Sequence, residues 1–295
     1  MADLIKLKVA NHLFCVEGAA EVEMLRNLPG FPVFVVEDEA EPEWKIRFGC
    51  DVAKPIAMTE LYKFNFELDI VTCAWGKTDE DTYYFVMNSH EQGSPNMVMR
   101  YRFGSNVVEA TQGGTPMMLR FAMWMALGML SCSSKMVLVH SSTIVHQNRA
   151  VLFLGESGTG KSTHTRLWLN HIPDAHLLND DSPVIAAEEQ GVFVYGSPWS
   201  GKTHCYHQLR FPLAAAVRLS QAPYNKIHRL SMVEAFSSLQ PSFPPALAQD
   251  ERYLDLMVDM LSEVLLQVPV FHLECLPDEA AAWTSHDAIF GPLEK

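Results

Sequence analysis

Residues 150–163, AVLFLGESGTGKST, decide the fold of this 295-residue chain. Residues 150–154 are all apolar, as in a strand buried on both faces, and at Gly155 they give way to the pattern G-x-x-x-x-G-K-[ST]. A pattern of this kind after a strand is a phosphate-binding loop, because glycines let the backbone turn its amide hydrogens onto a phosphate chain. The stretch therefore predicts an α/β domain that binds a phosphorylated ligand.

Two side chains at the end of the loop complete the phosphate site. Lys161 and Ser162 open the following helix, where the helix dipole and the free amides favour an anion. The ammonium of Lys161 can reach the terminal phosphates, and the hydroxyl of Ser162 can ligate Mg²⁺. We therefore expect ATP and Mg²⁺ as cofactors, with the phosphates bound by Gly155, Glu156, Ser157, Gly158, Thr159, Gly160, Lys161, Ser162 and Thr163.

The composition indicates an acidic, cytoplasmic protein. The chain carries 22 Lys and Arg against 35 Asp and Glu, a formal charge of −13, so we expect no nucleic-acid partner. The six cysteines are scattered without a C-x-x-C pair, which indicates neither a disulfide framework nor a structural zinc site. The longest apolar stretch, 121–130, is too short to span a bilayer, so we expect no membrane partner. A homo-oligomer is compatible with all of this.

The length allows two domains, and we place the first at residues 1–113 and the second at residues 114–295. The first domain is dominated by strand-like segments with turn-forming residues between several of them, which predicts an antiparallel, β-rich fold. The segments are 4–9, 33–36, 44–48, 64–71, 82–87 and 96–103. The glycines before Thr115 mark the boundary, and Pro116 begins an apolar helix.

The second domain is predicted to alternate strands and helices around the loop. A helix begins at residue 161, directly after the loop, and further helices are expected at 231–239 and 251–266. The expected strands are 135–140, 144–145, 150–154, 176–178, 183–186, 192–195, 213–219 and 268–273.

An acidic pair follows one of these strands. Strand 176–178 leads into Asn179, Asp180 and Asp181, and in open α/β sheets ligands bind at this end of a strand, here beside the loop strand. One carboxylate would hold Mg²⁺ with Ser162, and the other would take the proton of an alcohol acceptor. The residues leave open which aspartate has which role. The alternative is that Asp180 and Asp181 belong to an ordinary turn.

Two further side chains are candidates for the reaction. Lys202 ends the segment GSPWSGK, 196–202, where a cation after the flexible Gly201 can reach into a cleft and contact a phosphate. His140, which ends the strand before the loop strand, can hydrogen-bond the aspartates or a phosphate. The alternatives are a surface lysine and a structural histidine.

These motifs resemble a known family over residues 116–295, the HPr kinase/phosphorylase-like proteins, to which phosphoenolpyruvate carboxykinases are more distantly related. The resemblance rests on His140, on GESGTGKST at 155–163, on LLNDD at 177–181 and on GSPWSGK at 196–202. It implies a P-loop kinase domain with the fold of that family. It also implies that Lys161 binds phosphate, that Ser162 and one of Asp180 and Asp181 bind Mg²⁺, and that the other aspartate activates a serine hydroxyl.

The resemblance implies an ATP- and Mg²⁺-dependent serine kinase whose partner is a protein or peptide acceptor. The glycine-rich L-E-x-R-G-x-G segment of the bifunctional enzymes does not follow the aspartates here, which argues against phosphorolysis and against docking of the phosphocarrier protein HPr. Two alternatives stay open, a small-molecule kinase on the same scaffold and a regulatory protein that binds ATP without turnover.

Overall fold

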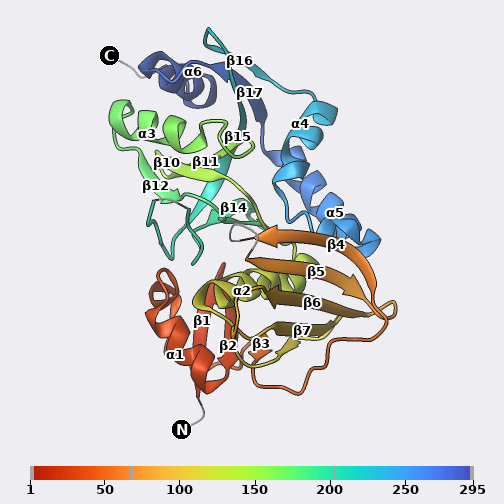
Figure 1. The fold of residues 1–295 in the computed structure, drawn as a ribbon. Coiled ribbons are helices and arrows are strands. Elements are labelled where there is room, and N and C mark those ends of the chain that lie inside the picture. Colours follow the sequence, from red (N-terminus) through yellow and green to blue (C-terminus); the bar gives the residue numbers. More distant parts are fainter. Residues whose placement is uncertain (1–2, 67–69, 202, 293–295) are drawn as a thin grey trace. The chain divides into compact units, whose positions relative to one another are not determined.

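The computed structural model describes residues 3–66, 70–201 and 203–292, and it shows a mixed α/β protein with two sheets (Figure 1). Contacts divide the chain into two compact units. The first unit is Met1–Ser134 with Ala246–Leu254, and the second unit is Lys135–Pro245 with Asp255–Lys295. This division differs from a boundary between residues 113 and 114, because it assigns helix α2 (Pro116–Ser131) and a later segment to the first unit.

The first unit contains an eight-stranded sheet in the order β1-β2-β3-β8-β7-β6-β5-β4. Helix α1 (Ala19–Asn27) lies between β2 and β3 in the sequence and brings the chain back across the sheet, so β3 runs parallel to β2. Strand β3 is also parallel to β8. The expectation of an antiparallel domain is wrong for these two pairs. The strands are β1 (Leu4–Val9), β2 (His12–Glu17), β3 (Trp44–Arg47), β4 (Thr59–Phe66), β5 (Val71–Lys77), β6 (Thr82–Ser89), β7 (Met97–Arg102) and β8 (Val107–Ala110).

Two expected strands of the first unit differ in the structure. Most of 33–36 belongs to the short 3-10 helix η1 (Phe31–Phe34), which begins after Gly30 at φ 96° and has Pro32 in its first turn. Proline has no N–H to donate to a sheet, which explains why this apolar run is not a strand. The expected strand 64–71 is divided, since β4 ends at Phe66 and β5 begins at Val71. Its residues 67–69 lie outside the described residues.

Helix α2 is apolar around its circumference because it is a core helix. Thr115 caps it by accepting a hydrogen bond from the amide of Met118 at 3.2 Å. The ring of Phe121 packs 5.7 Å from that of Phe85 on β6. Among the described residues, 116–134 is the one helical segment long and apolar enough to cross a membrane, yet 67% of its most apolar window is buried, as in the core helix of a soluble protein.

A buried carboxylate ties the later segment to the first sheet. The side chain of Asp250 is 0% exposed and accepts hydrogen bonds from Lys77 Nζ at 2.6 Å and from Tyr83 Oη at 2.9 Å. It also accepts the amide of Arg252 in the first turn of α5 (Glu251–Gln267). Burial by itself raises the pKa of Asp250, but the hydrogen bonds from Lys77 and Tyr83 hold that pKa below its usual value.

The second unit contains a nine-stranded sheet in the order β12-β10-β11-β15-β14-β13-β9, with β17 beside β15 and β16 beside β17. All of the strands expected in this part of the sequence are present, and β16 is additional. The strands are β9 (Met136–Leu138), β10 (Ser142–His146), β11 (Arg149–Leu154), β12 (His176–Asn179), β13 (Val184–Glu188), β14 (Gly191–Tyr195), β15 (Arg210–Gln221), β16 (Lys226–Arg229) and β17 (Val270–Cys275).

The strand directions bring distant segments to one edge of this sheet. Strands β11, β15 and β17 are parallel. Strand β10 lies between β11 and β12 and is antiparallel to both, so β12 points the same way as β11. The expectation that the strand before the acidic pair lies beside the loop strand is therefore wrong by one position. The C-terminal ends of β11, β12, β15 and β17 nevertheless lie at the same edge.

Two helices of the second unit pack against each other and against this sheet. They are α3 (Lys161–His171), which follows the loop, and α6 (Glu279–Phe290), which the sequence analysis did not predict (Figure 1). Trp168 of α3 is fully buried beside Phe153 and Val217 of the sheet. The expected helix 231–239 is confirmed as α4 (Met232–Leu239).

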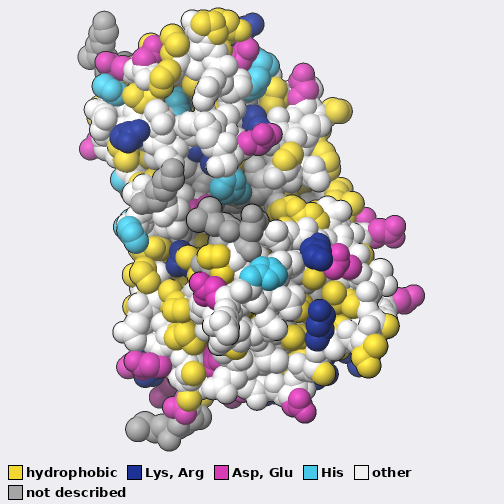
Figure 2. All heavy atoms as spheres, in the orientation of Figure 1, with side chains coloured by type: hydrophobic (Ala, Val, Ile, Leu, Met, Phe, Trp, Pro, Cys, Tyr) yellow, Lys and Arg dark blue, Asp and Glu magenta, His cyan; other side chains and the backbone are white. Residues whose placement is uncertain are grey.

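The surface mixes side chains of different kinds. On the face drawn in Figure 2, acidic and basic side chains are interspersed with apolar ones rather than gathered by kind. Apolar side chains exposed singly are ordinary on the surface of a soluble protein.

We expect Asp250→Ala to lower the free energy of unfolding by about 3 kcal/mol, because it leaves Lys77 and the buried Tyr83 without their acceptor. The matched control Asp255→Ala removes an exposed carboxylate from the same helix and should change the free energy by less than about 0.5 kcal/mol. Urea unfolding followed by circular dichroism measures both variants. Equal effects of the two substitutions would show that Asp250 does not hold this segment.

We expect acid to destabilise the second unit through His164 of α3. Burial lowers the pKa of His164 from 6.5 to about 4, so the folded state favours the neutral ring. The contribution of the neutral His164 ring to the free energy of unfolding is therefore fully present above pH 6.5, and it is lost as the pH falls towards about 4. Between pH 7 and pH 5 the loss is about 2 kcal/mol, measurable by urea unfolding at the two pH values. His164→Phe should flatten this dependence, and an unchanged slope would contradict the assignment.

Candidate functional site

The loop between β11 and α3 has a backbone that only glycine adopts easily at three positions. Gly155 has φ 153°, Gly158 has φ 83° and Gly160 has φ 110°. Space is also short at Gly155, because a Cβ would lie 2.8 Å from Thr159 Oγ1. The loop closes on itself when the amide of Thr159 donates to Glu156 O at 3.2 Å. Gly160 caps α3 without a side chain, which leaves the first amides of the helix for an anion.

Lys161 lies over the loop. Its Nζ donates to Gly155 O at 2.7 Å and to Glu156 O at 3.2 Å, and it lies 3.0 Å from His140 Nε2. Burial lowers the pKa of the Lys161 ammonium, an effect that Asp181 opposes and Arg218 reinforces. The cation is therefore held beside the glycines that would surround a phosphate.

Asp180 is the buried member of the acidic pair, with 7% of the residue exposed. Its Oδ1 accepts hydrogen bonds from Ser142 Oγ at 2.9 Å and from Ser162 Oγ at 3.3 Å. Its Oδ2 accepts the amide of Thr203 at 3.3 Å. Donors from three separate segments therefore hold this carboxylate in place, and one of them is the hydroxyl at the start of α3.

Asp181 is more exposed, with 37% of its side chain accessible. Its Oδ2 accepts a hydrogen bond from Ser182 Oγ at 2.9 Å, and its Oδ1 lies 3.4 Å from His140 Nδ1. An ammonium can only donate, so the contact with Lys161 makes His140 Nε2 an acceptor and places the proton of the neutral ring on Nδ1. His140 thus connects Lys161 to Asp181.

Asn179 holds the backbone of the turn that carries Asp181, and its role was not predicted. The residue is fully buried at the end of β12, and its Oδ1 accepts the amides of Asp181 and Ser182, both at 2.9 Å. Its Nδ2 donates to Trp199 O at 2.9 Å and to Ser197 Oγ at 3.2 Å. Asparagine before the acidic pair is a turn-forming residue, which is the signal that could have identified it.

Residues 196–201 pack directly on the acidic pair. A Cβ at Gly201 would lie 2.8 Å from Asp180 O, so the close approach requires glycine at this position. Ser197 Oγ donates to Ser182 O at 2.6 Å and fixes the other end of the segment. Lys202, which we expected to contact phosphate, lies outside the described residues.

Arg218 is a second residue that sequence reasoning missed. It pairs with Leu154 in the parallel ladder between β11 and β15, immediately before the loop. Its Nη2 lies 3.7 Å from Glu156 Oε1, and 22% of its side chain is exposed. The signal was a lone arginine within the apolar run 213–219, since a charge in a buried strand needs a partner.

The donor set beside the loop fits Mg²⁺. Mg²⁺ in phosphoryl-transfer sites takes hard oxygen ligands from one or two carboxylates, a hydroxyl, substrate phosphates and water. Ser162 Oγ and Asp180 Oδ1 are such ligands, and they lie side by side. Among the described residues no group of three or more His, Cys, Asp and Glu could hold a metal alone. An ion here would therefore share its ligands with phosphate.

The second unit thus brings His140, Lys161, Ser162, Asp180 and Asp181 into one site at the C-terminal edge of its sheet. Neither the protein-family models nor the curated proteins compared with the chain gave a match.

Proposed function

We propose that the chain is an ATP- and Mg²⁺-dependent kinase of the HPr-kinase-like type that phosphorylates a serine hydroxyl of a protein or peptide. The observation that carries the proposal is the pair of contacts that join the loop to the aspartates, Ser162 Oγ to Asp180 Oδ1 at 3.3 Å and Lys161 through His140 to Asp181. Phosphoryl transfer needs little beyond positioning and charge neutralisation, and these groups supply both.

The difference in burial supports a division of labour between the aspartates. Asp180 is held among three hydrogen-bond donors and would bind Mg²⁺ together with Ser162, and the ion would neutralise charge on the phosphates. Asp181 is accessible to an incoming acceptor and would take the proton of the serine hydroxyl. The new bond joins the serine oxygen to the γ-phosphorus, the bond to the bridging oxygen breaks, and ADP leaves.

The basic side chains have separate roles in this mechanism. Lys161 would bind the terminal phosphates, and His140 would orient Asp181 through its Nδ1 proton. Arg218 lies at the start of the loop near Glu156 and would add positive charge beside the phosphates. The cytoplasm, where ATP is supplied, is the proposed location.

The enzymatic claim is tested by incubating the full chain with γ-labelled ATP, Mg²⁺ and the protein and peptide fractions of cells that encode it. Acid-stable label on serine of one component would support the kinase and identify its acceptor. Binding of ATP without transfer to any fraction would instead favour a regulatory protein that binds ATP, and label on a small molecule would favour the alternative kinase.

We expect Asp181→Asn to lower kcat by about 10²- to 10⁴-fold, because the amide cannot accept the serine proton. The affinity for ATP should change little, since the carboxylate contacts Ser182 and His140. Asp180→Asn should instead raise the Mg²⁺ concentration needed for half-maximal rate, because it removes a ligand. Initial rates against Mg²⁺ and ATP separate the two effects. If Asp181→Asn had the same kcat as the unchanged protein, Asp181 would not be the base.

We expect Lys161→Ala to weaken the binding of Mg²⁺-ATP by about 10- to 100-fold, because a charge-assisted contact to phosphate is worth about 1.5 to 3 kcal/mol. The matched control Lys226→Ala removes an exposed lysine from β16 and should leave the affinity unchanged. Isothermal titration calorimetry measures both. Equal affinities of the two variants would place the phosphates elsewhere.

A further inference from the structure

A cavity of about 500 Å³ lies on the eight-stranded sheet of the first unit. Successive side chains of a strand point to opposite faces, and Phe85 of β6 packs on Phe121 of α2. Tyr84 of β6 and its cross-strand partner Arg100 of β7 therefore point to the other face, where the cavity lies. The lining residues are Arg47, Thr78, Asp79, Thr82, Tyr84, Arg100, Arg102, Ser105, Val107 and Glu109.

The lining of this cavity suits a small, strongly polar ligand. Its volume is within the range of about 300 to 1,000 Å³ that is usual for small-molecule sites. Val107 is the one lining residue without a polar side chain, and guanidinium groups and carboxylates are both present. A matching ligand therefore carries charges of both signs rather than an apolar surface.

One guanidinium of the lining has no partner of opposite charge. Arg100 donates from Nε and Nη2 to Glu109 Oε2, at 3.1 and 2.6 Å, and Arg47 Nε lies 3.0 Å from Glu17 Oε2. Arg102, which is exposed at the end of β7, forms no ion pair within the described part of the chain. One unmatched positive charge suits a singly charged carboxylate, which a guanidinium binds through two parallel N–H bonds. A phosphate dianion would bring excess negative charge beside the lining carboxylates.

An ionised carboxylate adjoins the same place. Asp79 Oδ1 accepts the amides of Asp81 at 2.9 Å and of Thr82 at 2.8 Å, and these bonds hold the pKa of Asp79 below its usual value. Thr82 is also the cross-strand partner of Arg102. Asp79 and Arg102 thus adjoin one residue, yet over the described residues they form no ion pair with each other. A ligand with two opposite charges close together would engage both.

We propose that this cavity binds a free α-amino acid, with its carboxylate on Arg102 and its ammonium on Asp79. The two charged groups of an α-amino acid are attached to the same carbon, which matches two complementary charges that adjoin Thr82. The hydroxyl of Tyr84 and the paired side chains beyond it favour a polar side chain on the ligand. The inference does not rest on the proposed function, because all of these residues belong to the first unit.

The test measures the binding of each of the twenty amino acids to the full chain by isothermal titration calorimetry at pH 7 and constant ionic strength. We expect at least one polar amino acid to bind with a Kd below about 1 mM. Its C-terminal amide lacks the negative charge and its N-acetyl derivative lacks the positive charge, so each should bind at least about 10-fold more weakly. The inference is overturned if none of the twenty binds, if either derivative binds as well as the amino acid, or if inorganic phosphate binds more tightly.

Two variants locate the binding in the cavity. Arg102→Gln removes the contact to the carboxylate, and Asp79→Asn removes the negative charge but keeps an oxygen that can accept the amides of Asp81 and Thr82. Each should weaken the amino acid by at least about 10-fold. The matched control Arg26→Gln, at an exposed position on α1 of the same unit, should bind it unchanged. Unchanged affinity in Arg102→Gln would place the amino acid elsewhere, and thermal unfolding verifies that each variant is folded.

Discussion

The carboxylate of Asp180 is the point on which the site depends. It accepts hydrogen bonds from the start of β10, from the start of α3 and from the segment after Gly201, which are distant in sequence. These donors can meet only because β10 runs antiparallel between β11 and β12, which brings the end of each outer strand to the start of the middle one. If β10 did not lie between β11 and β12, the hydroxyl of Ser142 would not reach Asp180.

Burial gives two identical side chains different chemistry. Asp180 is enclosed by donors, with Oδ1 directed at Ser162 and Oδ2 at the amide of Thr203, whereas Asp181 is accessible and faces His140. A buried carboxylate among fixed dipoles suits a role as a ligand, because no rearrangement is needed when a cation arrives. An accessible carboxylate suits proton transfer from a bulky partner, because the partner must reach it.

The sequence predicts the second unit better than the first. The loop, its strand and its helix follow from a strict pattern, and the hairpin after residue 183 follows from turn residues between apolar runs. In the first unit, α1, β2 and β8 were missed, and η1 was taken for a strand because an apolar run of four residues does not determine its own backbone.

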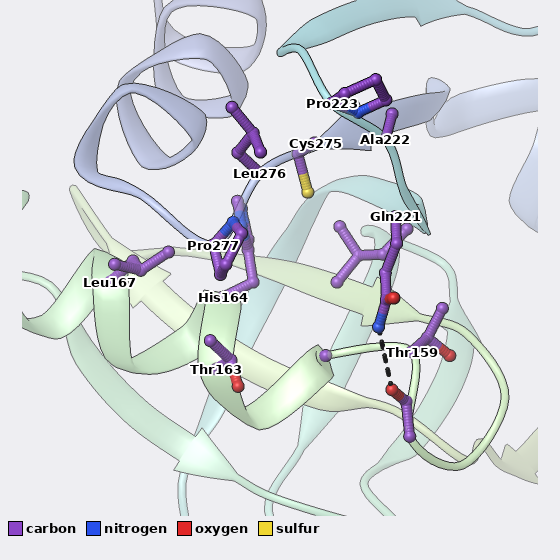
Figure 3. Close-up of a pocket in the computed structure, with 13 residues that line it drawn as sticks. Thr159, Thr163, His164, Leu167, Gln221, Ala222, Pro223, Cys275, Leu276 and Pro277 are labelled. Carbon is purple, nitrogen blue, oxygen red and sulfur yellow. Dashed lines mark hydrogen bonds between the residues drawn. The ribbon is translucent and has the colours of Figure 1, made fainter.

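The parts of the site that sequence patterns could not identify depend on long-range contacts. Asp180, Asp181 and Lys161 stand in recognisable contexts, but the support from Ser142 and Asn179 arises only when β10 and β12 pair. A cavity beside the loop is lined by the loop, by α3, and by the ends of β15 and β17 with the residues after them (Figure 3), and these two strands are about 50 residues apart in the sequence. No local pattern encodes a surface assembled in this way.

The discontinuity of the first unit has a consequence for synthesis on the ribosome. All eight strands of its sheet precede Ser134, but the segment that supplies Asp250 to Lys77 and Tyr83 begins only at Ala246. At ordinary rates of translation the sheet waits roughly 6 to 20 s for that carboxylate. During this interval the nascent sheet has a cation and a phenol that lack their acceptor, so the first unit cannot complete these contacts until Ala246–Leu254 has emerged.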